Sequence, residues 1–178
     1  MFQLFVDDEI KLLLIHEGFV PRYVELVEKN YEYLSKWLAW PPFCKTPDDF
    51  KQFVKSSLDK YADGESMTCA IEYHGKIVGN CSFNTINHDL KKVEVGYWLG
   101  EEYQGNGIIT RVCRFLQNYA FTELKMQKVE ISVAENNTPS RAVCERLSMK
   151  LEGIITNSEK VRDTIFSHAV YGIHVTET

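Results

Sequence analysis

The segment 101–110, which reads EEYQGNGIIT, carries the clearest chemical signature in the sequence. Gly105 and Gly107 permit backbone conformations with positive φ and let a ligand come close to the main chain. A long helix is predicted to follow, and the first backbone amides of a helix have no partner within it. Those amides and the helix dipole favour an anion. The segment therefore predicts a cradle for a phosphate or pyrophosphate, and residues 104–107 are called the glycine loop below.

The glycine loop matches neither of two familiar phosphate-binding patterns. A Walker loop needs a lysine and a hydroxyl residue after its second glycine, and the dinucleotide fingerprint needs a third glycine. A nucleotide-binding domain that uses the loop for ATP or NAD is therefore the weaker hypothesis. The loop could also be a turn that only closes a strand–helix junction, so its interpretation depends on its neighbours.

Two neighbouring features favour a ligand site. Gly96 interrupts the strand before the loop, which predicts a β-bulge that splays this strand from a parallel neighbour and frees main-chain donors. The segment 137–140 (NTPS) is predicted to begin a helix just past the end of that neighbour. One ligand could then place its phosphates on the glycine loop and its far end between the two strands, within reach of Asn137 and Ser140.

The elements that position these residues follow from hydrophobic periodicity. Helices are predicted to begin near Pro21, at Thr46 with a hydroxyl cap, after the glycine loop, and near Pro139. The predicted strands cover 10–15, 67–73, 77–83, 93–99, 129–133, 151–155 and 168–175, with polar loops at 84–92 and 156–160. This order indicates a mixed α/β sheet in which the strands near 93 and 129 run parallel.

The composition describes one soluble globular domain over residues 1–178. Hydrophobic residues make up 44% of the chain and charged residues 25%, which excludes a disordered chain. No apolar run approaches the roughly 20 residues that span a bilayer, so no membrane association is expected. The net charge is -5 and no Lys/Arg stripe forms, so nucleic acid is not an expected partner. Five scattered cysteines without a C-x-x-C motif argue against disulfides and a metal site, and for a cytoplasmic location.

Five motifs, taken in order, resemble the GNAT superfamily of acetyl-CoA-dependent N-acetyltransferases. More narrowly, they resemble its RimJ/RimL class, which acetylates the N-termini of ribosomal proteins. The motifs are K-W-L-x-W-P at 36–41, G-Y-W-L at 96–99, the glycine loop, N-x-x-S at 137–140 and L-E-G at 151–153. The resemblance covers essentially the full chain. It implies the α/β GNAT fold, which is a mixed, mostly antiparallel sheet with a central, splayed parallel strand pair flanked by helices.

The resemblance also implies roles for the matching residues. Acetyl-CoA would be the cosubstrate, and no metal ion would be needed. Its pyrophosphate would lie on the loop amides and the Gln104 side chain, and its pantetheine arm along the backbone of Trp98 and Leu99. Ser140 matches the proposed proton donor to the thiol, and Glu159 matches the proposed general base. The implied cofactor-binding residues are Trp98, Leu99, Gln104, Gly105, Asn106, Gly107, Ile108, Ile109, Thr110, Asn137 and Ser140.

The two implied catalytic residues have structural alternatives. Ser140 could be a helix cap alone, and Glu159, in a predicted polar loop, could be a solvated glutamate. Glu94 and Glu130 alternate with apolar strand residues and share one face of the predicted sheet. They could line the acceptor cleft and supply the base, or they could face solvent.

Five further side chains near the predicted site are less specific. His88 could relay a proton, although a surface-loop histidine explains it as well. Arg111 and Arg114 could meet the adenosine phosphate or face water. Cys144 has no histidine placed beside it by sequence, so a cysteine nucleophile is not expected. Ile109 replaces the small residue usual in the family, which predicts a tighter exit from the loop.

The sequence therefore predicts an N-acetyltransferase that works by direct transfer in a ternary complex. The preferred acceptor is a protein N-terminus, such as that of a ribosomal protein, and a polyamine or an antibiotic is an alternative acceptor. A non-catalytic acyl-CoA-binding module is a second hypothesis, because the departures from the family fall on the acceptor side. A homodimer is expected from the class resemblance only.

Overall fold

The computed structural model describes residues 2–175. Within this part of the chain, eight strands form one sheet in the order β1-β2-β3-β4-β5-β6-β8-β7. The strands are β1 (Gln3–Phe5), β2 (Ile10–Leu14), β3 (Met67–Tyr73), β4 (Lys76–Asn87), β5 (Lys92–Leu99), β6 (Lys128–Ala134), β7 (Lys150–Val161) and β8 (Thr164–His174). The helices are α1 (Val20–Lys29), α2 (Tyr31–Leu34), α3 (Pro47–Ala62), α4 (Ile108–Thr122) and α5 (Thr138–Arg146), with short 3-10 turns at Glu17–Phe19, Pro41–Phe43 and Glu101–Tyr103.

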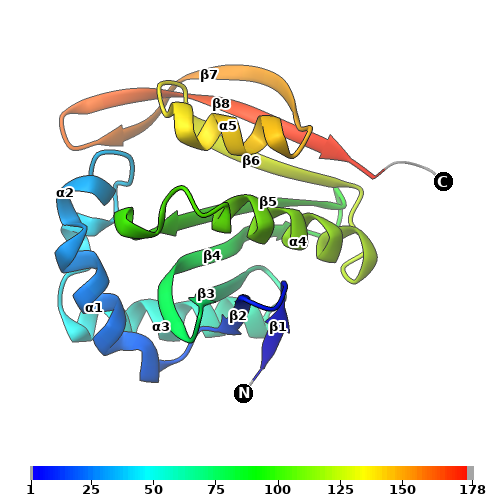
Figure 1. Ribbon diagram of the computed structural model, residues 1–178. Coiled ribbons are helices and arrows are strands. Elements are labelled where there is room, and N and C mark those ends of the chain that lie inside the picture. Colours follow the sequence, from blue (N-terminus) through cyan, green and yellow to red (C-terminus); the bar gives the residue numbers. More distant parts are fainter. Residues whose placement is uncertain (1, 176–178) are drawn as a thin grey trace.

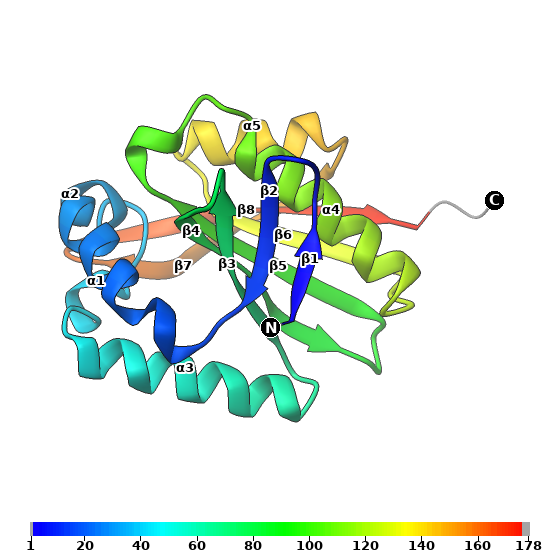
Figure 2. The same cartoon turned by 60° about the horizontal axis from the view of Figure 1, so that its bottom comes forward.

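Helices cover both faces of the sheet (Figures 1 and 2). On one face, α4 and α5 close a core that extends from β2 to β8 and includes Val95, Leu116 and Ile131. On the other face, α1 and α3 pack with β2 and β3 around Tyr23 and Phe50. The sequence predicted this mixed sheet with its parallel pair, and β5 and β6 are the parallel strands. The neighbouring strand pairs on either side of them are antiparallel.

Local sequence signals set the ends of two helices. Thr46 caps α3: its hydroxyl accepts a hydrogen bond from the Asp49 amide at 3.2 Å, and the Asp49 carboxylate accepts one from the Thr46 amide at 2.8 Å. This reciprocal pair confirms the predicted helix start. The helix after the glycine loop begins at Ile108, which is buried and belongs to the core side of α4.

The predicted loop at 84–92 is wrong, because β4 continues to Asn87. A bulge between Phe83 and Thr85 leaves Asn84 outside the ladder, and pairing with β5 resumes with Thr85 opposite Glu94. Past the bulge, Thr85 is exposed and Ile86 and Asn87 are half-buried, so these residues do not show the regular alternation of buried and exposed positions that marks a half-buried strand. The alternation of apolar residues therefore ended at the bulge, whereas the hydrogen-bonded pairing of β4 with β5 continued beyond it.

The predicted polar loop at 156–160 is also wrong. These residues belong to β7, which pairs with β8 along a long hairpin that closes at residues 162 and 163. Nearly every residue of β7 is exposed, because this strand forms the outer edge of the sheet (Figure 1). A strand that buries neither face lacks apolar alternation, so only its first part, residues 151–155, was predicted as a strand. Glu159 therefore lies in a strand.

The short strand β1 was not predicted either. It pairs with β2 in antiparallel register, with Leu4 opposite Leu12. Three residues are too few to show a period. Among residues 2–175, no helix has the length and apolar character needed to cross a bilayer.

Candidate active site

The parallel strands β5 and β6 pair over only three residues each. Lys92, Val93 and Glu94 face residues 128–130, and beyond Glu94 the two strands diverge. From residue 95 to Leu99, β5 has no strand partner on that side. The divergence opens a cleft of about 1580 Å³ that both strands line, together with the glycine loop, α5 and the segment between α2 and α3. The splayed pair is confirmed, and it places the candidate site at the centre of the sheet.

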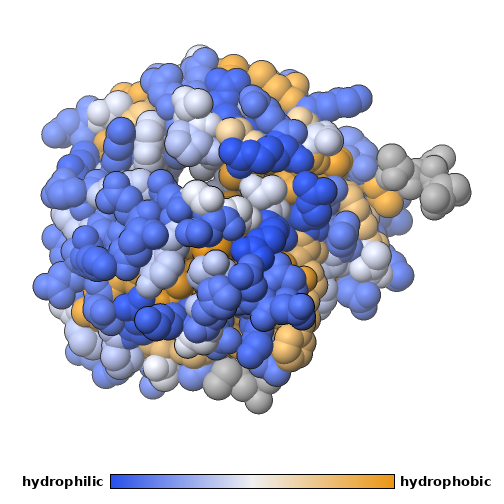
Figure 3. Space-filling view, viewed as in Figure 1, coloured by the Kyte–Doolittle hydropathy of each residue, from blue (hydrophilic) through white to orange (hydrophobic). Residues whose placement is uncertain are grey.

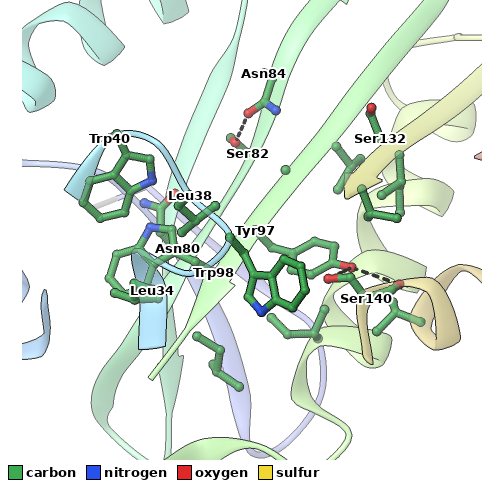
Figure 4. Close-up of a pocket in the computed structure, with 18 of the residues that line it drawn as sticks. Leu34, Leu38, Trp40, Asn80, Ser82, Asn84, Tyr97, Trp98, Ser132 and Ser140 are labelled. Carbon is green, nitrogen blue, oxygen red and sulfur yellow. Dashed lines mark hydrogen bonds between the residues drawn. The ribbon is translucent and has the colours of Figure 1, made fainter. Parts of the chain in front are cut away.

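The bulge expected at Gly96 lies in the neighbouring strand. Gly96 pairs regularly with Ser82, and the irregularity is at Asn84 in β4. A Cβ on Gly96 would lie 2.5 Å from Asn84 Nδ2, so the glycine is needed because the Asn84 side chain crosses it. Asn84 also accepts a hydrogen bond from the Ser82 hydroxyl at 2.6 Å (Figure 4). This polar pair lines the cleft beside β5.

The glycine loop leads directly into α4 and presents bare amides. Gly105 and Gly107 have φ of +78° and +68°, and a Cβ added to either would meet no atom within 4 Å. Space is therefore open in front of the loop. Among the described residues, the backbone amides of Gly107, Ile108, Ile109 and Thr110 donate no hydrogen bond. These are the unpaired donors of a helix N-terminus, and they border the cleft.

The side chains of the loop hold its shape. Asn106 Nδ2 donates to the carbonyl oxygens of Tyr103 at 3.0 Å and Gln104 at 3.2 Å. The Gln104 side-chain amide donates to the Tyr33 hydroxyl, although the sequence suggested that it would bind phosphate. In this structure the backbone amides, and not these two side chains, are free to meet a ligand.

The residues just before the first glycine are held by the helical layer. Residues 101–104 each bond to α1, to α2 or to the residue between them. The pairs are Glu101 with Asn30, Glu102 with Lys29, Tyr103 with Arg22 and Gln104 with Tyr33. Asn30 is only 4% exposed; its Oδ1 accepts from the Glu101 amide at 2.8 Å and its Nδ2 donates to the Leu26 carbonyl at 2.8 Å. The glycine loop is therefore anchored at its first end by a buried contact.

Ser140 lies in the first turn of α5, across the cleft from the glycine loop. Asn137 caps this helix, and its Oδ1 accepts a hydrogen bond from the Ser140 amide at 3.3 Å. The Tyr97 hydroxyl lies 3.3 Å from Ser140 Oγ and donates to it (Figure 4). Burial raises the pKa of Tyr97, so this phenol stays protonated. Tyr97 was missed from the sequence, where it counted only as part of the strand motif.

Glu159 reaches the same cleft from β7. Its carboxylate lies 3.3 Å from His168 Nε2, and His168 Nδ1 lies 3.1 Å from Ser132 Oγ. All three residues line the cleft. His168 and Ser132 were not singled out in the sequence, because only the pairing of β8 with β6 and β7 brings them to Glu159.

The structure separates the two other candidate carboxylates. Glu94 lines the cleft and accepts a long hydrogen bond, 3.4 Å, from Asn84 Nδ2. Glu130 does not line it, and it is held by Lys92 at 2.6 Å and Lys128 at 2.7 Å. Partial burial opposes ionisation of Glu130, but these two lysines outweigh it and lower its pKa. Glu130 therefore stabilises the end of the paired segment, and Glu94 remains beside the open part of the cleft.

The less specific candidates have structural partners. His88 Nε2 lies 3.1 Å from the Gly64 carbonyl on the surface. Arg111 pairs with Asp7 at 2.9 Å and Glu9 at 2.7 Å, which ties α4 to the β1–β2 turn. Cys144 is fully buried, and burial raises the pKa of its thiol to about 12. Burial therefore disfavours a nucleophilic thiolate at this position. Arg114 donates to the Arg146 carbonyl at 3.2 Å.

A parallel pair that splays beside a helix N-terminus defines the class of protein, namely an acyl-transferring enzyme built on this mixed sheet. Residues 20–150 match the family model described as "Acetyltransferase (GNAT) domain". The chain therefore belongs to the GNAT acetyltransferase family and is an N-acetyltransferase. This confirms the fold and the enzyme class that the five motifs predicted.

Individual relatives agree with the family match. The "Putative ribosomal N-acetyltransferase YdaF" of Bacillus subtilis (strain 168) is 33% identical over 175 residues, which is 98% of this chain and 91% of that protein. A structure of RimL, a ribosomal L7/L12 alpha-N-protein acetyltransferase, in complex with coenzyme A superimposes with a TM-score of 0.94 at 25% identity and covers 98% of each chain. The microcin C7 self immunity acetyltransferase MccE, in complex with acetyl-CoA and AMP, gives 0.91 at 29% identity, covering 96% of this chain and 94% of that one.

Proposed function

We propose that this protein transfers the acetyl group of acetyl-CoA to the α-amino group of a protein N-terminus, directly and within a ternary complex. The observation that carries the proposal is the set of free amides at residues 107–110, at one end of a cleft that continues between two diverging strands. The relatives named for ribosomal-protein acetylation support the acceptor class. A cytoplasmic location and a homodimer are part of the same proposal.

The donor side of the cleft fits a pyrophosphate joined to an extended arm. The free amides of Gly107–Thr110 and the dipole of α4 would hold the diphosphate. The open edge of β5, including Trp98 and Leu99, would bond to an amide-bearing arm in the manner of an added strand. When bound, acetyl-CoA supplies a thioester carbonyl that an amine can attack. The role of the chain on this side is to orient that carbonyl between β5 and β6.

The departing thiolate needs a proton, and Ser140 is the proposed donor. Tyr97 donates to Ser140 Oγ, which leaves the serine's own proton free to point into the cleft. A thiol has an ordinary pKa of about 8.5, so its thiolate leaves readily and a hydroxyl donor suffices. Glu159 is the proposed general base, and it would act on the acceptor amine through a relay. A free α-amino group has a pKa of about 8, against about 10.4 for lysine, so an N-terminal acceptor needs only a mild base.

Donor binding is tested by blocking the glycine loop. The Gly107→Trp substitution should place an indole in the open space before the loop amides and abolish acetyl-CoA binding in calorimetry. Gly75→Trp is the matched control, because Gly75 also has positive φ, +76°, and open space around it but lies in the β3–β4 turn away from the cleft. The control should bind like the wild type. Equal affinity in the wild type and Gly107→Trp, with both proteins folded by circular dichroism, would refute the proposed cradle.

Acceptor choice is tested by thiol release from acetyl-CoA. The panel contains peptides with free N-terminal Ser or Ala, the same peptides with a blocked N-terminus and one internal lysine, and spermidine. We expect release only with the free N-termini, and mass spectrometry should place the acetyl group on the α-nitrogen. Faster release with spermidine would assign a small-molecule acceptor instead. Binding of acetyl-CoA without release on any amine would support the non-catalytic module. Light scattering on the same sample tests the homodimer.

A further inference from the structure

Three side chains from three adjacent strands form a connected chain along the acceptor side of the cleft. Glu159 on β7 contacts His168 on β8 at 3.3 Å, and His168 contacts Ser132 on β6 at 3.1 Å. Glu159 pairs with Phe166, and Ala134 pairs with His168, so both contacts join diagonal neighbours on one face of the sheet. The register of the strands therefore places these three side chains next to one another.

The chemistry of the end group sets the direction of the hydrogen bonds. An ionised carboxylate only accepts, so Glu159 requires the proton of His168 on Nε2. The other ring nitrogen, Nδ1, then carries a lone pair and accepts from the Ser132 hydroxyl. Ser132 Oγ keeps lone pairs that are free to accept a further proton. His168 is 16% exposed and Glu159 39%, so the chain leads from a sheltered position to solvent.

The strand order separates the backbone of Glu159 from the divergence of β5 and β6. β8 lies between β7 and β6, and only β6 borders the divergence from β5. Neighbouring strands are about 4.8 Å apart, so β7 lies roughly 10 Å from β6. Glu159 is therefore two strands away from the point where the acetyl carbonyl would sit. Ser132 lies on β6 two residues beyond its last pairing with β5, and Figure 4 shows it across the diverging strands from Tyr97 and Trp98.

We infer that Ser132 and His168 carry the proton away from the acceptor amine, with Glu159 as the group that positions and neutralises His168. This inference rests on the proposed function. As the amine nitrogen bonds to the acetyl carbon, one of its N–H bonds breaks and the proton passes to Ser132 Oγ. The serine's own proton moves to His168 Nδ1. The carbon–sulfur bond breaks, the thiolate takes a proton from Ser140, and Ser140 regains a proton from water. His168 afterwards releases its proton to water at the exposed end of the chain.

The hydrogen-bond chain itself is tested without turnover. Histidine ring ¹⁵N spectra of the wild type should show His168, assigned by its loss in His168→Gln, as the neutral Nε2–H tautomer. Glu159→Gln should shift its Nε2 signal and Ser132→Ala its Nδ1 signal, while His88 and His174 stay unchanged. An Nδ1–H tautomer, or signals that do not respond to either substitution, would overturn the inference. This result is independent of whether the acceptor has been identified.

The catalytic part is tested with the serine-terminal peptide that the wild type acetylates fastest. His168→Gln should lower kcat by about 10²-fold or more while the KM for acetyl-CoA stays the same. Imidazole added to His168→Ala should restore part of the rate, an effect that a purely structural histidine would not show. Glu94 lines the same cleft from β5 and is the other titratable group near these residues. The pH dependence of kcat is therefore measured for the Glu94→Gln variant as well as for the wild type.

The matched control is His174→Gln. His174 lies on the same strand, is 68% exposed and has its own glutamate partner, Glu152, at 3.8 Å. It should retain the wild-type rate. A wild-type rate for His168→Gln, or a loss that imidazole does not relieve in His168→Ala, would overturn the inference while leaving the acetyltransferase assignment intact. Failure of the wild type itself to release thiol with any amine would instead refute the proposed function.

Discussion

The Tyr97 hydroxyl orients the Ser140 hydroxyl in the cleft. It lies on the open stretch of β5, and its phenol donates to Ser140 Oγ at 3.3 Å and approaches the Ser140 carbonyl at 3.5 Å. A serine hydroxyl has one proton and rotates freely unless a neighbour fixes its lone pairs. The donated hydrogen bond from Tyr97 occupies one lone pair and so limits where the serine proton can point.

The Tyr97→Phe substitution tests this orientation. It keeps the ring and removes the hydroxyl, so packing should be preserved and the loss of about 1 kcal/mol of hydrogen bonding should lower kcat by about fivefold. The KM for acetyl-CoA should not change. If Tyr97 acts through Ser140, the double variant with Ser140→Ala should be no slower than Ser140→Ala alone. Additive losses in the four-protein cycle would show that Tyr97 acts by another route.

The element that matters most for the donor site is the anchored turn before α4. Each of residues 101–104 contacts the α1–α2 layer, and among the four partners only Asn30 is a buried residue. The amides that face the cleft are therefore held in place by a helical layer on the other side of the turn.

Asn30→Ala should loosen this turn. It removes a buried side chain that accepts from the Glu101 amide and donates to the Leu26 carbonyl, and the loss of these two hydrogen bonds costs about 1–3 kcal/mol of unfolding free energy. Acetyl-CoA affinity should fall as well, because the loop amides lose their support. Lys29→Ala is the control: it removes the neighbouring solvent-exposed pair with Glu102, which solvent screens, and should change the stability much less than Asn30→Ala. Equal destabilisation of the two variants in urea titrations would contradict the distinction.

The elements also show which parts of the structure the sequence could predict. The glycine loop, the cap at Thr46 and the parallel pair all rest on local signals, and each was found. The bulge at Asn84 was assigned to Gly96, because a glycine in a strand does not reveal which neighbour it makes room for. The length of the β7–β8 hairpin was underestimated, because neither face of β7 is buried. His168 could not be found, because its role depends on register between β6, β8 and β7.

The whole molecule presents the reaction centre from two sides of one sheet. The helix N-terminus that favours the donor belongs to the layer of α4 and α5. The Ser132–His168–Glu159 chain lies on the opposite face from Ile131 and Ala169, which belong to the core under those helices. Figure 3 shows an opening in the surface of the molecule with polar side chains around it. Under the proposed function, the donor and the acceptor would meet in this one cleft from opposite faces of the sheet.

The three-residue pairing between Lys92–Glu94 and residues 128–130 is where the strand ladder joins the two halves of the sheet. One half contains β1 to β5, and the other half contains β6, β8 and β7. Beyond Glu94, no strand hydrogen bonds connect the two halves within residues 2–175. A ligand whose amide groups bond to the backbone of β5 would supply some of the missing hydrogen bonds. The two halves should then move less relative to each other when the cleft is occupied, and this motion should return each time coenzyme A dissociates.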